Sequence, residues 1–152
     1  MNHASRTYPE ECCGLLLGQR DRPTPTSKNS PLKQVLEIRE TVNAWDREVG
    51  EELTTVIPHL GTGKSDRYFI DPKDLLNAQR YVRDRGLEIV GIYHSHPDHP
   101  AVPSESDRLL AWPEYSYLIL SLQQGQVVDW QSWCLDDQHQ FQAEEILSVE
   151  PA

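Results

Sequence analysis

Short apolar runs separated by turn residues define most of the strands that we expect in this chain. Residues 14–18 form an apolar run with a glycine at each end, and residues 34–40 alternate between apolar and polar side chains. Residues 115–122 and 127–135 are rich in apolar and aromatic side chains, with polar residues and a glycine at 123–126 between them. The pattern predicts four strands, of which the last two form a hairpin.

A fifth strand is expected over residues 87–96, because this segment is apolar on both faces as far as its histidines, which is typical of a central strand. Strict alternation would place Leu87, Ile89 and Tyr93 on one face and Val90 and Ile92 on the other.

The sequence predicts a helix over residues 71–86 and a shorter one over residues 104–111. Asp71 can cap the first turn, Pro72 suits the first helical position and Gly86 can end the helix. Its inward face would consist of Leu75, Ala78 or Gln79, and Val82. Strands that alternate with helices predict α/β or α+β packing. The length predicts one domain over residues 1–152, with irregular insertions at about 19–31 and 45–66.

The charge and the cysteines indicate which kinds of partner and which cellular compartment to expect. The 14 Lys and Arg residues against 24 Asp and Glu residues give a formal net charge of −10, which disfavours nucleic acid and anionic membranes as partners. Residues 1–6 are too polar for a secretory signal. Because Cys12 and Cys13 are adjacent and Cys134 is alone, a disulfide framework is not expected. We therefore expect a cytoplasmic protein with reduced thiols.

Three histidines within residues 94–99 are the main chemical anomaly. Side chains alternate along a strand, so His94 and His96 should project from the same face and reach one metal ion. A carboxylate in the following segment 104–107 could supply a third ligand and leave the fourth position to water, as in catalytic zinc sites. Ser104 and Asp107 also match a helix capping box, and the two roles can coexist.

A metal-bound water also needs a proton acceptor, and two glutamates precede the strand at residues 14–18. Glu11 should point to the same side of the strand as Cys13 and Leu15, whereas Glu10 should point to the other side. Position alone is weak evidence for choosing Glu11 over Glu10 as the proton acceptor. The segment 61–65 is only partly similar to a phosphate-binding loop, because Pro58 occupies the position of its first glycine.

The spacing His94-Ser95-His96, seven residues, Ser104, two residues and Asp107, with Glu11 upstream, resembles the signature of the JAMM (MPN+) metalloprotease family. Further agreement with its short stand-alone prokaryotic members covers residues 8–18, Arg67-Tyr68, Asp71-Pro72 and Gly91-Ile92-Tyr93. The resemblance implies an α/β fold with a mixed β-sheet flanked by helices, the MPN or cytidine-deaminase-like architecture.

The resemblance also implies a role for each residue of the signature. His94, His96 and Asp107 would hold one Zn²⁺ with water in the fourth position. Glu11 would be the general acid and base, and Ser104 would stabilise the oxyanion. Should Asp107 not be a ligand, Asp98 is the next candidate.

The activity that the resemblance implies is hydrolysis of a peptide or isopeptide bond after the C-terminal glycine of a ubiquitin-like or sulfur-carrier protein, whose Gly-Gly tail could add as a strand. We expect the stretch at 45–66 to be a flap that grips this partner. A homodimer is compatible with the sequence. The alternative is a non-catalytic MPN-type interaction scaffold, although such scaffolds usually lose zinc ligands.

Overall fold

The computed structural model describes residues 2–21, 32–46, 49, 52, 64 and 67–148. The described helices are α1 (Asn2–Thr7), α3 (Pro72–Arg85) and α4 (Glu105–Leu110). The described strands are β1 (Cys13–Arg20), β2 (Lys33–Thr41), β3 (Glu88–Pro97), β4 (Ser116–Gln123), β5 (Gln126–Leu135) and β6 (Phe141–Glu144). None of the helices in these ranges is long and apolar enough to cross a membrane.

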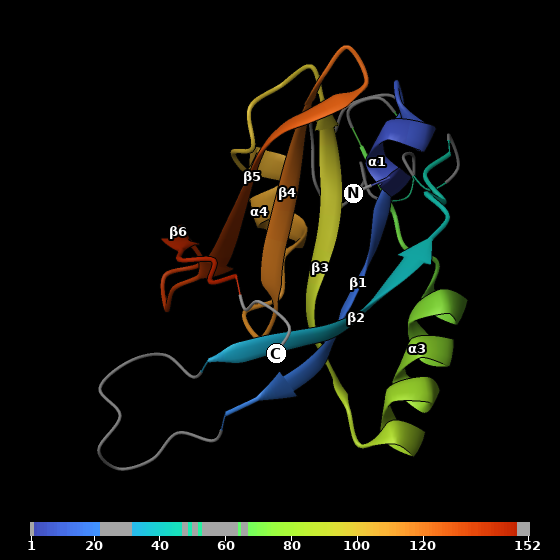
Figure 1. The fold of residues 1–152 in the computed structure, drawn as a ribbon, viewed down its shortest axis with the longest axis vertical. Coiled ribbons are helices and arrows are strands. Elements are labelled where there is room, and N and C mark those ends of the chain that lie inside the picture. The colour runs from blue at the N-terminus through green and yellow to red at the C-terminus, as the bar shows by residue number, and fades with distance from the viewer. Residues whose placement is uncertain are drawn as a thin grey trace.

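The strands form one mixed sheet in the order β2-β1-β3-β4-β5-β6 (Figure 1). Only β3 and β4 pair in parallel, and the other neighbours are antiparallel. A parallel pair needs a crossover connection, and here α4 lies in that crossover. The crossover starts at the carboxyl end of β3, so it brings the first turn of α4 to the end of β3 that carries the histidines. The expected fold class, a mixed sheet flanked by helices, is confirmed.

Two apolar clusters lie on the opposite faces of the sheet. The first combines Leu15, Leu17 and Ile92 with Ala78 and Val82 of α3. The second consists of Leu16, Val90, Tyr93, Leu118, Leu120 and Leu122, with Cys12 and Ala4 of α1. In Figure 1, α1 accordingly lies in front of the upper part of the sheet, whereas α4 lies behind β4. Burial on both faces explains why β3 is apolar from Ile89 to Tyr93.

The side chains of β3 change phase at a β-bulge. Leu16 pairs with Gly91 whereas Leu17 pairs with Ile89, so Val90 is an extra residue in β3. An extra residue shifts the alternation of every later side chain to the other face. The residue after the bulge must be a glycine, Gly91, because a Cβ at this position would lie 2.5 Å from the carbonyl oxygen of Ser116 on β4.

The assignment of faces by strict alternation is therefore wrong beyond Ile89. Ile92 packs in the same cluster as Ile89, on the face of α3. Tyr93 packs with Val90 on the face of α1 instead. His94 and His96 follow the shifted phase, which turns them toward the face that α4 covers.

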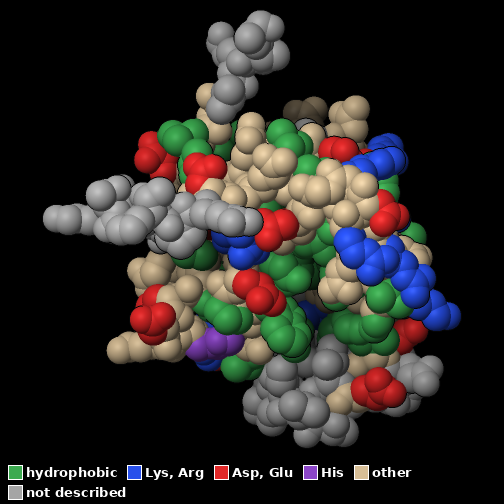
Figure 2. Space-filling model, turned by 90° about the horizontal axis from the view of Figure 1, so that it is seen from below, with side chains coloured by type: hydrophobic (Ala, Val, Ile, Leu, Met, Phe, Trp, Pro, Cys, Tyr) green, Lys and Arg blue, Asp and Glu red, His purple; other side chains and the backbone are tan. Residues whose placement is uncertain are grey.

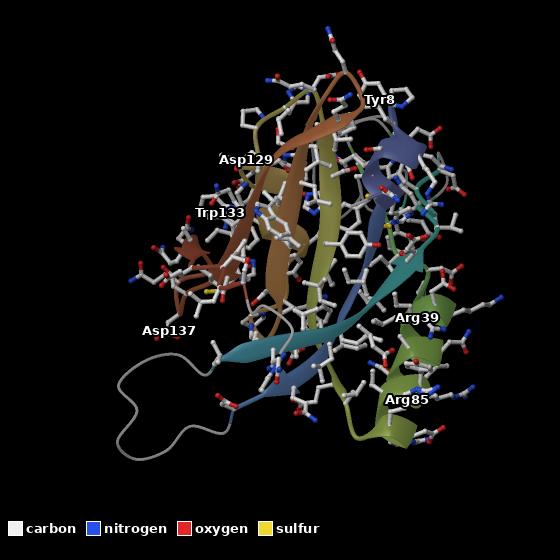
Figure 3. The ribbon with its side chains drawn as sticks, in the orientation of Figure 1. Tyr8, Arg39, Arg85, Asp129, Trp133 and Asp137 are labelled. Carbon is white, nitrogen blue, oxygen red and sulfur yellow. The ribbon has the colours of Figure 1, made fainter. Side chains whose placement is uncertain are left out.

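Helix α3 has the ends that the sequence predicts. The Asp71 side chain accepts a hydrogen bond from the Lys73 N–H, and Gly86 adopts a left-handed conformation with φ of 67°. Arg85 of α3 and Arg39 of β2, labelled in Figure 3, approach the ring of Tyr81 at 4.0 and 5.2 Å from its centroid. The Arg39 contact joins α3 to the edge strand β2.

The lower end of the molecule is hollowed. Viewed from below in Figure 2, hydrophobic side chains surround a hollow, with Lys and Arg gathered on one side. A cavity of about 450 Å³ at the start of β3 is lined by residues that include Arg20, Val82, Leu87 and Tyr115. It lies at the opposite end of β3 from the histidines.

Three parts of the chain differ from the sequence prediction or extend it. Strand β1 continues to Arg20, so the insertion expected at about 19–31 begins later. Helix α1 and strand β6 have no counterpart in the prediction. Most of the predicted flap at 45–66 lies outside the described residues, although Trp45, at its start, is buried.

A prediction follows for the two glycines Gly91 and Gly86. Gly91→Ala places a methyl group against rigid backbone and should lower the free energy of unfolding by about 3 kcal/mol. Gly86→Ala, whose methyl group meets no atom within 4 Å, carries only the penalty of a left-handed alanine, about 1 kcal/mol. Urea unfolding measures both. Equal losses would contradict the close approach of β4 to the backbone at Gly91.

Candidate metal centre

His94 and His96 face each other at the carboxyl end of β3. Their Nε2 atoms are 3.0 Å apart, and both residues are buried. The prediction that they share a face is confirmed. Between them, Ser95 points to the other face, where its Oγ accepts a hydrogen bond from Cys12 N at 2.8 Å. Ser95 N in turn donates to Cys12 O, so β3 is fixed to the chain that follows Glu11.

Asp107 completes a triangle of ligand atoms. Its Oδ2 lies 3.3 Å from Nε2 of each histidine. The same oxygen accepts a hydrogen bond from Ser104 N at 2.8 Å, and the Ser104 Oγ accepts one from Asp107 N at 3.1 Å. This is the reciprocal capping box that the sequence predicts. The box holds the carboxylate in the first turn of α4, directed at the histidines.

The size of the triangle fits a tetrahedral metal ion. An ion with bonds of about 2.0–2.1 Å holds its ligand atoms about 3.3–3.4 Å apart, close to the 3.0 and 3.3 Å found here. Two imidazoles and one carboxylate are a ligand set that Zn²⁺ accepts while one position stays open. The residues present therefore fit the metal that the sequence implies.

The tautomer of His96 is set by the loop after β3. Its Nδ1 lies 2.8 Å from the carbonyl oxygen of Pro100. Since a carbonyl only accepts, Nδ1 carries the proton, and the lone pair on Nε2 stays available to a metal ion. A backbone carbonyl behind a ligating histidine is a common way to orient the ring.

His94 is held by stacking and burial. Its ring lies 4.4 Å from that of Tyr68, with an angle of 22° between the planes, and its side chain is fully buried. Burial lowers the pKa of His94 and so favours the neutral imidazole. Neutral imidazole is the form that binds metal ions.

Asp107 stays ionised in spite of its surroundings. Burial by itself would raise the pKa of Asp107, but His94, His96 and the Ser104 N–H interact with the carboxylate and hold its pKa well below the usual range. The centre thus pairs a carboxylate anion with two imidazoles.

Glu11 lies beside the triangle, two residues before the start of β1. It is 4% exposed, whereas Glu10 is exposed. Glu11, His94 and His96 each offer a ligand atom within 4.8 Å of the others. Asp107 Oδ2 approaches both imidazoles to 3.3 Å, so two carboxylates, Asp107 and Glu11, lie near the pair of histidines.

The centre opens into a cavity of about 340 Å³. Its lining consists of Glu11, Arg67, His96, His99, Pro100, Val102 and Ser104. Asp98, the alternative third ligand, is directed elsewhere: its Oδ2 accepts a hydrogen bond from Tyr8 at 2.6 Å, and its Oδ1 accepts one from Gln124 N. His99, which the sequence leaves without a role, lines the cavity together with three of the five predicted site residues, Glu11, His96 and Ser104.

Sequence reasoning missed Tyr68 and Asn43. Tyr68 is part of the Arg67-Tyr68 match, yet nothing in the pattern indicates that it stacks on His94. The Asn43 side chain donates to the carbonyl oxygens of Glu11 and Arg67. An isolated asparagine after a strand gives no signal of such contacts.

Two named proteins are similar in sequence to parts of this chain. A desampylase of Haloferax volcanii is 33% identical over 114 residues, which cover 74% of this chain and 63% of that protein. A probable TtuB-protein conjugate cleaving protease of Thermus thermophilus is 35% identical over 45% of this chain and 47% of that protein. The chain thus spans about half to two thirds of the length of these two relatives.

A solution structure from Desulfitobacterium hafniense matches with a TM-score of 0.71 and 30% identity, over 99% of this chain and 86% of that one. The family model of prokaryotic homologs of the JAB domain, Prok-JAB, matches residues 1–136, which include all five residues of the signature. This chain belongs to the Prok-JAB family.

Proposed function

We propose that this chain is a zinc-dependent metallopeptidase that cleaves the peptide or isopeptide bond after the C-terminal glycine of a ubiquitin-like or sulfur-carrier protein. The observation that carries the proposal is the triangle of His94, His96 and Asp107 beside the buried Glu11 at the edge of a cavity. A scaffold would have no need for two buried imidazoles, an ionised carboxylate and a second buried carboxylate in one place.

Each residue has a chemical task in this reaction. His94, His96 and Asp107 hold the ion, which when bound supplies Lewis-acid polarisation of a substrate carbonyl and of a water molecule. The Glu11 carboxylate removes a proton from the attacking water and delivers it to the nitrogen of the leaving amine. One group therefore serves both proton transfers.

Ser104 can cap α4 and act in the reaction at once. Its hydroxyl oxygen uses a lone pair to accept from Asp107 N, and a serine hydroxyl keeps its own O–H for a further bond. Since Ser104 lines the cavity, its O–H is available to the oxyanion that forms when the carbonyl is attacked.

The two named relatives support the substrate class. One is a desampylase and the other a probable protease for TtuB-protein conjugates. We propose that this chain also takes a protein with a Gly-Gly tail, and that residues 1–152 form one JAMM/MPN+ domain. Incubation with sulfur-carrier conjugates, read by intact mass, tests the activity: release of the free carrier with its terminal glycine supports it, and intact conjugates in the presence of zinc contradict it.

Replacing the general base separates catalysis from metal binding. Glu11→Gln keeps the shape of the side chain and removes the proton acceptor, so the rate of conjugate cleavage should fall at least about 10²-fold. Zinc content, measured by elemental analysis, should equal that of the wild type. Near-normal turnover with zinc bound would contradict the role of Glu11.

Two aspartates in the same region test the ligand set. Asp107→Ala removes one of three ligands and should lower the zinc content of protein purified without added zinc. Asp98→Asn is the matched control, because Asp98 bonds Tyr8 and Gln124 instead, and it should keep the wild-type zinc content. The reverse pattern would assign the third ligand to Asp98.

Ser104→Ala should lower the cleavage rate by about 10²- to 10³-fold, the scale for losing one oxyanion donor. It should also lower the free energy of unfolding by about 1 kcal/mol through loss of the helix cap. Ser104→Thr, which keeps the hydroxyl, is the control for both readouts. A rate loss of only a few-fold with the full loss of stability would mean that Ser104 is a cap alone.

A further inference from the structure

The side chain of Asn43 makes four hydrogen bonds. It lies two residues after β2 and is 7% exposed. Its Nδ2 donates to Glu11 O at 3.0 Å and to Arg67 O at 2.9 Å. Its Oδ1 accepts from Trp45 N at 3.0 Å and from Phe69 N at 3.1 Å. An amide side chain has two N–H donors and an oxygen with two lone pairs, so Asn43 uses its whole capacity.

The four partners also fix which way the amide points. Two partners are carbonyl oxygens, which only accept, and two are backbone N–H groups, which only donate. Turning the amide over would oppose like groups at all four contacts. A buried amide that is fully satisfied in one orientation is a rigid joint between the segments it bonds.

Those segments carry the candidate site. Glu11 and Arg67 both line the cavity. Tyr68, which stacks on His94, lies between Arg67 and Phe69 and is therefore held on both sides by Asn43. The Glu11 N–H is anchored separately, at 2.6 Å from Lys64 O. Asn43 thus connects the segment of the carboxylate with the segment that packs on a histidine.

We propose that Asn43 is a positioning residue of this site, which holds the Glu11 carboxylate in register with the His94 and His96 ligand atoms. The proposal rests on the function proposed above. Asn43 touches no ligand atom itself, so its effect passes through the main chain of Glu11 and of residues 67–69. Displacement of a catalytic group by about 1 Å can lower a rate about 10²-fold.

Asn43→Asp is the sharpest test of the two donated bonds. It keeps the size of the side chain and the acceptor for Trp45 N and Phe69 N, but it sets a carboxylate oxygen against the carbonyls of Glu11 and Arg67. On a Gly-Gly conjugate that the wild type cleaves, we expect kcat to fall about 10- to 100-fold. KM should change less than about 3-fold, and zinc content should not change.

Thr41→Val is the matched control. Thr41 lies two residues earlier, is buried to a similar extent and donates its Oγ1–H to Cys13 O at 3.0 Å. It lies outside the site, so its replacement should lower stability while kcat stays near the wild-type value. Equal losses of kcat in the two variants at equal loss of stability would overturn the proposal, as would a wild-type kcat in Asn43→Asp.

Amide hydrogen exchange gives a readout that does not depend on activity. In Asn43→Ser, a milder change for the case in which Asn43→Asp does not fold, exchange at Trp45 and Phe69 should speed up while amides within β1 and β3 keep wild-type rates. Uniform acceleration would show a general structural role and overturn the proposal. An inactive wild type with zinc bound would instead overturn the proposed function, and the exchange pattern still decides whether Asn43 is the local joint.

Discussion

The side of the sheet on which β3 presents its histidines depends on one extra residue. With Val90 inserted opposite Leu16, every later residue of β3 faces the other way. His94 and His96 consequently face the crossover that contains α4, and Ser95 faces the segment that contains Cys12. Without the insertion, Ser95 would occupy the face of the candidate centre. The glycine beside the bulge lets β4 approach closely, so the bulge and the parallel pairing are compatible at the same point.

The hydrogen bonds that build the fold near the site are also those that orient its chemistry. The capping box begins α4 and directs the Asp107 carboxylate at both imidazoles. The bond from His96 to Pro100 O holds the loop after β3 and selects the tautomer whose Nε2 lone pair is available. Because each bond serves stability and geometry together, site variants need both readouts to be interpreted.

Residue pattern was sufficient for the parts of the structure that depend on local signals. The ends of α3 follow from Asp71, Pro72 and Gly86, and the capping box follows from Ser104 and Asp107. The convergence of His94 with His96 follows from the period of a strand. The family resemblance, rather than the spacing, singled out Asp107 and Glu11.

What the pattern could not supply depends on contacts between distant segments. A bulge is a property of the pairing between β1 and β3, so alternation read along β3 alone misplaced Tyr93 and Ile92. The four bonds of Asn43 involve partners up to 32 residues away. Helix α1, too, is held by a contact distant in sequence, since His3 hydrogen-bonds the Tyr93 hydroxyl on the face of the sheet that α1 covers. The periodicity of apolar residues along the sequence does not reveal any of these contacts.

X-ray absorption at the zinc edge tests the central claim most directly, because it reports the atoms around the ion without requiring a substrate. For protein purified with zinc, the account predicts two imidazole nitrogens and two oxygens, one from Asp107 and one from water, at about 2.0–2.1 Å. The spectrum of Asp107→Ala should lose the carboxylate contribution. A sulfur ligand near 2.3 Å, as a cysteine would give, or the absence of bound zinc in the wild type, would contradict it.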